Sequence, residues 1–363
     1  MTEAKVKCEI CGKEAHTLEA HIAEEHQMTL SEYKAKHSKT VLSNYALQVL
    51  NQRFKATKLG LPVKVDFNIQ KAFGISNFPK EKIQGYNRPH ESTPAIDTNY
   101  VFDKNLLSLV MFAIENQNER VLMTGHTGSG KSSVIEQVVA RLNLPFCRVN
   151  CDGDLTRADF VGQTVLENQG TKFQYGLLPM AMKEGRVLLI DEWDAASPSV
   201  SLALQSVLEE GGKLTITETQ EVIHPHPDFR IFATSNTKGQ GDDSGMYHGT
   251  QPQNYAALDR FTMVGLVDYP TATVEMQIIT AKTGIKAEHK DSVLERLVQF
   301  ATLVRKAFIK EEITCTMSTR TVVNVARKLI AFGDIKQAYS IAFMNKLNSE
   351  DLEFCQEIYS KVW

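Results

Sequence analysis

A glycine-rich run that ends in a lysine and a serine carries the clearest chemistry in this sequence. The residues GHTGSGKS, from Gly125 to Ser132, match the pattern G-x-x-x-x-G-K-[ST] at each required position. Glycines let backbone N–H groups surround phosphate oxygens, Lys131 is placed to reach the terminal phosphates, and the Ser132 hydroxyl is placed to ligate Mg²⁺. The pattern therefore predicts a site for ATP and Mg²⁺. The predicted nucleotide-binding residues are Gly125, His126, Thr127, Gly128, Ser129, Gly130, Lys131, Ser132 and Ser133.

Two adjacent carboxylates follow the apolar segment of RVLLIDEWD later in the chain. A buried strand that ends in Asp191 and Glu192 would place both acids beside the phosphates, at the carboxyl edge of a parallel sheet. We expect Asp191 to act on the magnesium side and Glu192 to orient and polarise the attacking water. Such a pair by itself is typical of a solvated strand end, but its combination with the glycine-rich loop favours the catalytic interpretation.

Three further polar residues occur where an ATP-hydrolysing site requires them. Asn236 ends the segment FRIFATSN, and its amide is suited to holding the hydrolytic water against the terminal phosphate. Arg260, in LDRF, is the candidate for stabilising transition-state charge. Arg320, in MSTRT, is the candidate for contacting the same phosphate from a helical tail. Each has an ordinary structural alternative, a helix or strand cap for the asparagine and a surface charge for either arginine.

Four residues near the amino terminus have the spacing of a metal site. Cys8, Cys11, His21 and His26 form C-x₂-C-x₉-H-x₄-H, which is close to Cys₂His₂ zinc spacing with a short central gap. Two thiolates and two imidazoles would complete a tetrahedral Zn²⁺ site, and a unit this small needs the metal to fold. His16 is a competing ligand because it also precedes His21 by x₄. Unliganded cysteines with surface histidines are the other alternative.

The residues of the nucleotide site require elements that bring them together. Short apolar segments (VLMTG, FCRVN, RVLLID, FRIFATSN and the run after Arg260) alternate with helical stretches such as 133–143. This alternation predicts a parallel sheet with flanking helices in an α/β domain, whereas the periodicity after about residue 270 is helical. The predicted parts are a metal-binding unit at 1–40, a connecting segment at 41–98 that is helix-prone to about residue 60, an α/β core at 99–270 and a helical domain at 271–363.

The composition limits the classes of partner. The chain has 40 Lys and Arg against 43 Asp and Glu, and this net charge of −3 favours neither nucleic acid nor a membrane surface as a partner. No window approaches the roughly 18 consecutive apolar residues of a membrane span, and the first residues lack a secretory apolar stretch. We expect a cytoplasmic protein whose 6 cysteines are reduced or bound to metal.

The motifs GHTGSGKS, LLIDEWD, ATSN, LDRF and MSTRT occur in the order typical of one group of ATPases. They resemble the AAA+ ATPases of the helix-2-insert group, which includes the MoxR ATPases and the small subunits of magnesium and cobalt chelatases. The segments VDFNIQKAFGI, DTNYVFD and NTKGQGDDSGMYHGTQ look more specifically like the CobS family of aerobic cobaltochelatase subunits. This likeness covers roughly residues 64 to 360 and implies an AAA+ core with a helical lid.

The resemblance also implies how the site residues are shared. The family forms a ring, expected here to be a hexamer, with ATP between neighbouring subunits. Arg260 would then be supplied by the adjacent subunit, and Arg320 would be a second sensor. The residues that would act within one subunit are Lys131, Ser132, Asp191, Glu192 and Asn236.

Insertions and partners follow from the same resemblance. It implies β-hairpins in FVGQTVLENQGTKFQYG and KLTITETQEVIHPHP, facing the ring pore or a partner. The implied partners are a CobT-like adhesion-domain protein and a large chelatase subunit. The family's function is to power cobalt insertion into a corrin, and the motor subunit itself holds no corrin.

The amino-terminal segment resembles the short zinc fingers of the Ros and MucR regulators, which bind DNA. Its stretch HTLEAHIAEEH, however, carries Glu19, Glu24 and Glu25 and no basic residue, whereas DNA-reading helices require Arg or Lys. We therefore expect a docking module for a protein partner. The leading hypothesis is a chelatase-type motor. The alternatives are a MoxR-like remodelling ATPase and, from a different class, a zinc-finger DNA-binding regulator.

Overall fold

The structure is a computed structural model in which contacts divide the chain into two units. One unit comprises Met1–Val65 with Tyr86–Arg88, and the other comprises Asp66–Gly85 with Pro89–Trp363. The described residues are 5–37, 41–43, 62–167, 170–237, 239, 241, 249–286 and 292–363. Most of the stretch expected to be helix-prone, up to residue 60, lies outside the described residues. The domain boundaries near residues 40, 98 and 270 stay predictions.

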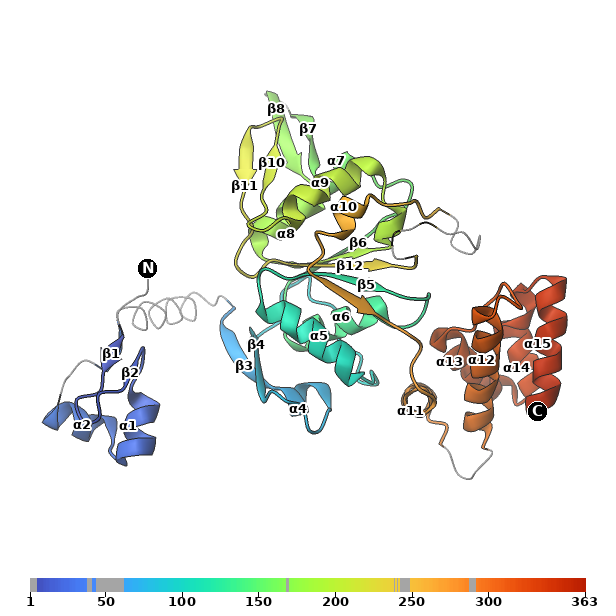
Figure 1. The fold of residues 1–363 in the computed structure, drawn as a ribbon, viewed down its shortest axis with the longest axis horizontal. Coiled ribbons are helices and arrows are strands. Elements are labelled where there is room, and N and C mark those ends of the chain that lie inside the picture. Colours follow the sequence, from blue (N-terminus) through green and yellow to red (C-terminus); the bar gives the residue numbers. More distant parts are fainter. Residues whose placement is uncertain are drawn as a thin grey trace. The chain divides into compact units, whose positions relative to one another are not determined.

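The larger unit is built on a parallel five-stranded sheet in the order β13-β5-β12-β9-β6 (Figure 1). Every residue of β5, β9 and β12 is buried, as expected for strands that are covered on both faces. The predicted α/β core and its strand segments are confirmed. The strands are β5 (Arg120–Thr124), β6 (Phe146–Asn150), β9 (Val187–Asp191), β12 (Arg230–Ser235) and β13 (Met263–Leu266).

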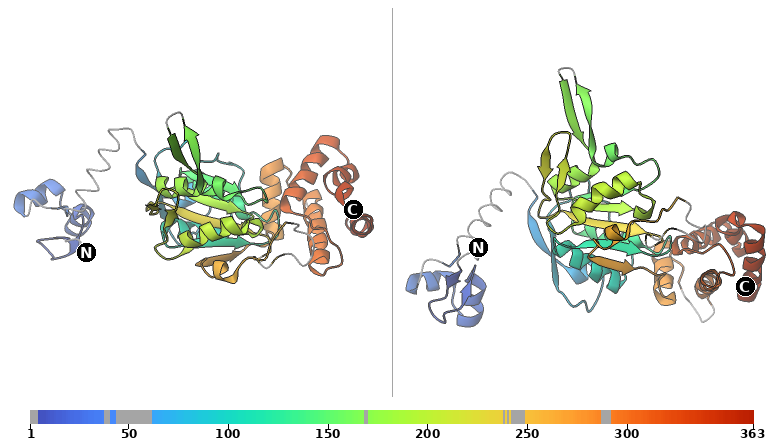
Figure 2. Two further views of the ribbon diagram at one scale, coloured as in Figure 1. Left: turned by 90° about the horizontal axis from the view of Figure 1, so that it is seen from above. Right: turned by 45° about the horizontal axis from the view of Figure 1, so that its top comes forward.

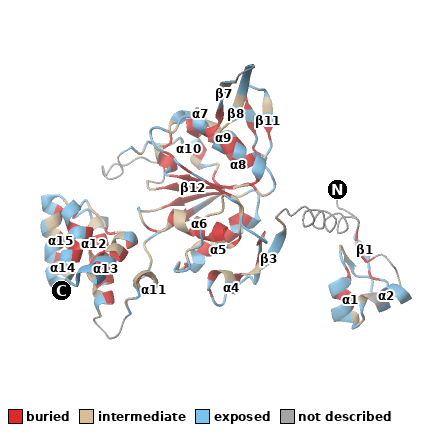
Figure 3. Cartoon of the chain, turned by 180° about the vertical axis from the view of Figure 1, so that it is seen from behind, coloured by how far each residue is buried: buried red, intermediate tan, exposed pale blue. Residues whose placement is uncertain are grey.

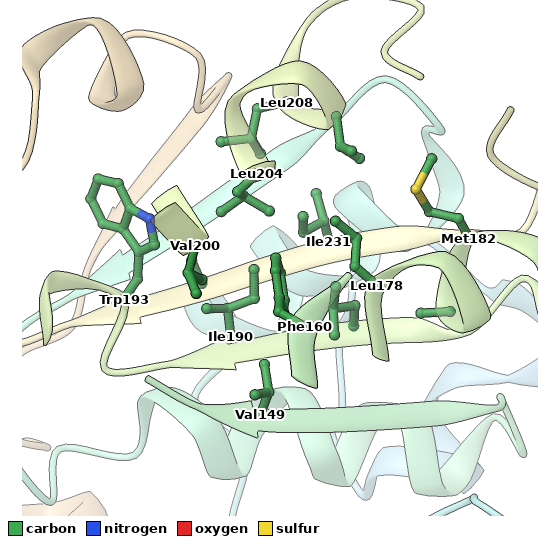
Figure 4. Packing of buried hydrophobic residues seen from close by; sticks show 14 of the residues in the cluster. Val149, Phe160, Leu178, Met182, Ile190, Trp193, Val200, Leu204, Leu208 and Ile231 are labelled. Carbon is green, nitrogen blue, oxygen red and sulfur yellow. The ribbon is translucent and has the colours of Figure 1, made fainter. Parts of the chain in front are cut away.

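Two hydrophobic clusters lie on opposite faces of this sheet, because successive side chains of a strand point to opposite sides. Leu188 and Ile190 of β9 belong to one cluster, with Phe160 (Figure 4). Val187 and Leu189 belong to the other. The first cluster is covered by α7 (Arg157–Phe160), α8 (Leu177–Glu184) and α9 (Pro198–Leu208), and the second by α4 (Ile69–Phe73), α5 (Lys104–Glu115) and α6 (Lys131–Arg141). Figure 3 shows the sheet as a continuous buried layer between these helices.

Two antiparallel hairpins interrupt the α/β order. β7 (Gly162–Glu167) pairs with β8 (Gly170–Tyr175), and β10 (Leu214–Ile216) pairs with β11 (Glu221–Ile223). Both fall in the segments where the family resemblance implied hairpins, so that prediction is confirmed. Figure 2 shows β7 and β8 projecting away from the sheet, and Leu166 on β7 is 87% exposed.

Beyond β13 all secondary structure of the described residues is helical, as predicted. The elements are α11 (Ala272–Thr283), α12 (Val293–Ile309), α13 (Thr319–Phe332), α14 (Ile335–Ala342), the 3₁₀ helix η2 (Met344–Lys346) and α15 (Ser349–Val362). The remaining elements of the larger unit are the 3₁₀ helix η1 (Trp193–Ala195) and α10 (Tyr255–Leu258), and β3 (Lys64–Asn68) pairs with β4 (Lys82–Tyr86). In the described parts of the chain, no helix combines the length and apolar character that a membrane span requires.

A buried ion pair ties three of these helices together. Arg305 on α12 donates to both carboxylate oxygens of Glu275 on α11, at 2.8 and 2.6 Å. Thr319, the first residue of α13, donates its hydroxyl to Glu275 Oε1 at 2.8 Å. Glu275 is 0% exposed, and a buried charge of this kind is tolerated only when its oxygens are satisfied. The pair therefore fixes the start of α13, where Arg320 lies, against α11 and α12.

The described residues of the smaller unit form two short strands, two helices and a small core. Its elements are β1 (Val6–Lys7), β2 (Glu14–Ala15), α1 (Glu19–His26) and α2 (Leu30–Lys36). A capping box formed by Thr29 and Glu32 begins α2. A core of this size supplies little stability by itself. Its buried apolar residues are Cys8, Leu18, Ile22, Tyr33 and Val41.

Candidate functional site

The glycine-rich loop connects β5 to α6 and is shaped for a phosphate group. Gly125 and Gly128 have φ angles of 153° and 70°, and a Cβ on Gly125 would lie 2.0 Å from the carbonyl oxygen of Val267. Only glycine fits such a position. α6 begins at Lys131 without a side-chain cap, so the N–H groups of its first turn are available to an anion. Within the described residues, Ser129 Oγ is buried without a hydrogen-bond partner, which also suits a phosphate oxygen.

Lys131 lies at the centre of this loop and is only 7% exposed. Its Nζ donates to Gly125 O at 2.5 Å, to His126 O at 3.0 Å and to Asn236 Oδ1 at 2.9 Å. The structure thus brings together the predicted lysine and the predicted strand-end asparagine. Burial lowers the pKa of Lys131 to about 8, although the nearby carboxylate of Asp191 opposes this shift.

Asp191 is the last residue of β9, and its carboxylate contacts side chains from three other elements. Its Oδ1 accepts a hydrogen bond from Ser132 Oγ at 2.7 Å and another from the hydroxyl of Thr234 on β12. Its Oδ2 pairs with the guanidinium of Arg148 on β6, which also bonds Glu136 at 2.9 Å. The predicted magnesium-side residues, Ser132 and Asp191, are therefore in direct contact. Together they offer the hard oxygen atoms that Mg²⁺ prefers.

Glu192 follows immediately, in an unusual backbone conformation. Its φ is 56°, in the left-handed region, and its N–H donates to Thr234 Oγ1 at 3.1 Å. Its side chain is exposed, unlike that of Asp191. A glutamate held in this conformation is strained, and such strain collects at functional sites. The turn places two consecutive acids in different surroundings, one buried and paired and one accessible to water.

The two predicted arginines lie in different places. Arg260, just after α10, donates to Glu209 Oε1 at 3.0 and 3.3 Å and to Ala256 O, rather than to any of the described residues of the nucleotide site. Arg320 is exposed near the start of α13 and lines a cavity of about 520 Å³ together with Gly128 to Gly130. The structure therefore brings Arg320 to the loop and leaves Arg260 away from it.

Sequence reasoning missed two contributors to this site, Arg148 and Thr234. Arg148 is the one charged residue of the strand FCRVN, and this exception to an apolar pattern was the available signal. Thr234 lies on β12, two positions before Asn236, and the parallel pairing of β12 with β9 brings it to Asp191. Nothing in the local sequence indicates that contact.

The predicted metal ligands of the smaller unit converge. The Sγ atoms of Cys8 and Cys11 and the Nε2 atoms of His21 and His26 take part in contacts of 3.1 to 3.4 Å, and ligand atoms of all four residues lie within 4.8 Å of one another. His16 lies outside this group, and its Nδ1 is hydrogen-bonded to Ser43 Oγ at 2.9 Å.

The environment of Cys8 also suits a metal ligand. Burial opposes ionisation of the thiol, but hydrogen bonds from the backbone N–H groups of Cys11 and Ile10 and from the side chains of Tyr33 and His21 lower the Cys8 pKa to about 6. A thiolate that accepts such bonds resembles a metal-bound sulfur in charge. The donor set of two thiolates and two imidazoles is the one that tetrahedral Zn²⁺ sites use.

Comparison with known proteins agrees with the nucleotide site. Residues 120–261 match the family "AAA domain (dynein-related subfamily)", and residues 275–358 match "CbbQ/NirQ/NorQ C-terminal". The chain is 30% identical to protein CbbQ of Hydrogenophilus thermoluteolus, over 48% of this chain and 62% of that protein. It is 28% identical to the denitrification regulatory protein NirQ of Pseudomonas aeruginosa, over 63% of this chain and 84% of that one.

A stronger likeness is to the aerobic cobaltochelatase subunit CobS of a Sinorhizobium species, at 38% identity over 301 residues. The match covers 82% of this chain and 90% of the relative. These matches identify an ATPase that binds ATP and Mg²⁺, with the parallel sheet and helical carboxyl-terminal region described above. The chain belongs to the CobS family of AAA+ ATPases.

Proposed function

We propose that this ATPase works as a ring motor that couples ATP hydrolysis to remodelling of a partner complex, in the manner of a chelatase motor subunit. One observation carries the proposal. Lys131, Ser132, Asp191 and Asn236 meet at one end of the sheet, whereas Arg260 is paired with Glu209. The described residues of a single chain thus hold most of a hydrolytic site, with Arg260 away from it, so we infer that Arg260 of the neighbouring subunit completes the site.

In this proposal each residue has a distinct task. The loop N–H groups and Lys131 hold the terminal phosphates, and Asn236 orients the hydrolytic water. Glu192, which is exposed at the strand end, polarises that water. Mg²⁺ would be held by Ser132 and Asp191, and when bound it neutralises charge on the phosphates. Arg320, which lines the cavity beside the loop, acts as the second sensor.

The client is proposed from the relatives. The CobS relative is named as a subunit of aerobic cobaltochelatase, so we infer a partner assembly with a CobT-like adhesion-domain protein and a large subunit that binds the corrin. The hairpin β7–β8 supports a partner-facing role, because Leu166 exposes an apolar side chain on it. The NirQ and CbbQ relatives keep a MoxR-like remodelling function as the second candidate.

For the smaller unit we propose a structural Zn²⁺ site formed by Cys8, Cys11, His21 and His26. The convergence of their ligand atoms supports it, and a core as small as this one needs a metal to be stable. The acids Glu19, Glu24 and Glu25 are exposed on α1 and would repel nucleic-acid phosphates. We therefore propose that this unit docks a protein partner.

The sharing of Arg260 between subunits is tested by mixing two inactive variants. Arg260→Ala lacks the arginine and Lys131→Ala lacks the phosphate contact, so each alone should lose about 10³-fold in ATP turnover. Assembled together, they should regain part of the activity, because a Lys131→Ala subunit can lend Arg260 to the intact loop of its neighbour. Turnover is measured on co-expressed and separate preparations. A mixture as inactive as its parts would contradict the shared site.

The charge of Lys131 should make ATP affinity depend on pH. Its pKa of about 8 means that the free protein loses this positive charge above that pH, whereas bound phosphate favours the protonated lysine. The dissociation constant for ATP should therefore rise by up to about tenfold per pH unit above pH 8. Binding is measured by calorimetry from about pH 7.5 to about pH 9.5, in steps of about half a pH unit. In Lys131→Arg, whose guanidinium stays charged, the affinity for ATP should not change over this pH range. A wild-type affinity that is equally independent of pH would rule out the mechanism.

The client is identified with a variant that stalls with ATP bound. Glu192→Gln should bind ATP normally and hydrolyse it about 10² to 10³ times more slowly, because the water loses its polarising carboxylate. Affinity purification with ATP then captures the engaged partner, with Lys131→Ala as the control that cannot enter this state. Recovery of a large corrin-binding subunit is expected. Recovery of a different assembly instead would favour the MoxR-like function.

The zinc site predicts a metal content near one Zn²⁺ per chain, measured by mass spectrometry of the purified protein. Cys8→Ser and Cys11→Ser should lose the metal, since each removes one of the proposed ligands. His16→Ala should keep it, because His16 lies with Ser43 outside the ligand group. Zinc-free wild-type protein, or loss of zinc only in His16→Ala, would show that the ligand set is wrong.

A further inference from the structure

Asp194, the last acid of RVLLIDEWD, has no role in the function proposed above. It lies in η1, directly after β9, and is 0% exposed. Removing a carboxylate from water is costly unless its oxygens accept hydrogen bonds from well-placed donors. Among the described residues Oδ1 of Asp194 is buried without a hydrogen-bond partner, whereas Oδ2 accepts several. The donors to Oδ2 therefore identify the part of the molecule that this buried carboxylate stabilises.

The donors to Oδ2 belong to Ser235, the last residue of β12, and to the two residues that follow it. The N–H groups of Asn236 and Thr237 each donate to Asp194 Oδ2 at 2.9 Å. The hydroxyl of Ser235 donates to the same oxygen at 2.9 Å, and that of Thr237 at 2.8 Å. Hydrogen bonds to a charged acceptor are about twice as strong as neutral ones. One buried oxygen thus fixes the backbone on both sides of the Asn236 side chain.

The same turn is tied to a second segment. The backbone carbonyl of Asp194 accepts a hydrogen bond from the N–H of Gln251 at 2.8 Å and another from Nε2 of Gln253 at 3.3 Å. Gln251 ends NTKGQGDDSGMYHGTQ, the segment most specific to this family resemblance. The residue that fixes the strand end at Asn236 is therefore also connected to the chain that follows it.

We propose that Asp194 is a positioning residue for ATP hydrolysis, acting through Asn236. Its carboxylate holds the backbone at residues 235–237 so that the Asn236 amide stays beside Lys131, to which it is bonded at 2.9 Å. The inference rests on the proposed role of Asn236 in the hydrolytic site. A displacement of about 1 Å at such a group costs about 10²-fold in rate, so the support of Asn236 matters as much as its presence.

The first measurement separates binding from chemistry. Asp194→Ala should lower kcat about 10- to 10²-fold and change KM for ATP by no more than about threefold, because the glycine-rich loop stays intact. Asp351→Ala is the matched control. Asp351 is also a buried aspartate, 4% exposed, and it is remote in sequence from the nucleotide site. Its carboxylate accepts hydrogen bonds from the N–H of Thr314 at 3.0 Å and from the Thr314 hydroxyl at 2.7 Å. Asp351→Ala should lower the free energy of unfolding about as much as Asp194→Ala does, and it should keep the wild-type kcat.

The second measurement is a double-mutant cycle with Asn236→Ala. If Asp194 acts through Asn236, adding Asp194→Ala to Asn236→Ala should lower kcat by no more than about twofold further. Losses that multiply would overturn the inference, because Asp194 would then act elsewhere, for example through the charge of Lys131. A wild-type kcat in Asp194→Ala would overturn it as well.

Two outcomes keep the inference separate from the function on which it rests. If Asn236→Ala keeps wild-type turnover, Asn236 has no role in hydrolysis and this inference fails with it. If Asn236→Ala loses turnover while Asp194→Ala does not, the role of Asn236 stands and the positioning role of Asp194 is refuted. If Asp194→Ala does not fold, Thr237→Val takes its place in the cycle, since it removes one donor and keeps the shape. Thr237→Val should then lower kcat about threefold in the wild-type background and leave kcat unchanged in the Asn236→Ala background. An unchanged kcat in the wild-type background contradicts the proposal.

Discussion

The nucleotide site depends on the carboxylate of Asp191, because it is the point where four elements meet. Asp191 is the last residue of β9. Its carboxylate accepts hydrogen bonds from the hydroxyls of Ser132 on α6 and Thr234 on β12, and it forms an ion pair with Arg148 on β6. It is 6% exposed, so the partners offset the cost of removing a charge from water. Since each partner comes from a different element, the relative positions of three strands and the loop are set by one buried anion.

A second buried anion performs the same task for the carboxyl-terminal helices. Glu275 joins α11, α12 and the first residue of α13 through Arg305 and Thr319. Ser318, one residue earlier, lies so close to the glycine-rich loop that a Cβ on Gly128 would meet its Cβ at 2.5 Å. The contact leaves room for glycine only, which connects the shape of the loop to the position of α13 and of Arg320.

The amino-terminal unit is organised differently. Its core is a handful of apolar side chains, and its most concentrated feature is the group of two cysteines and two histidines. Larger domains obtain stability from buried apolar area, whereas units of this size commonly rely on a metal. The CobS likeness covers 82% of the chain, and the proposed client belongs to that part, so the proposed docking role of this unit is argued from its own residues alone.

Some of this protein follows from the sequence by itself. The glycine-rich loop, the acids after RVLLI and the ligand spacing near the amino terminus are contiguous or nearly so, and the chemistry of such patterns requires only local geometry. The buried strands and the helical tail follow from periodicity for the same reason. Thr234, Arg148 and Asp194 act through side chains that meet only when parallel strands pair in register, and Arg260 meets Glu209 across 51 positions. Which buried charge is satisfied by which distant donor is decided by packing, so only the tertiary structure could determine it.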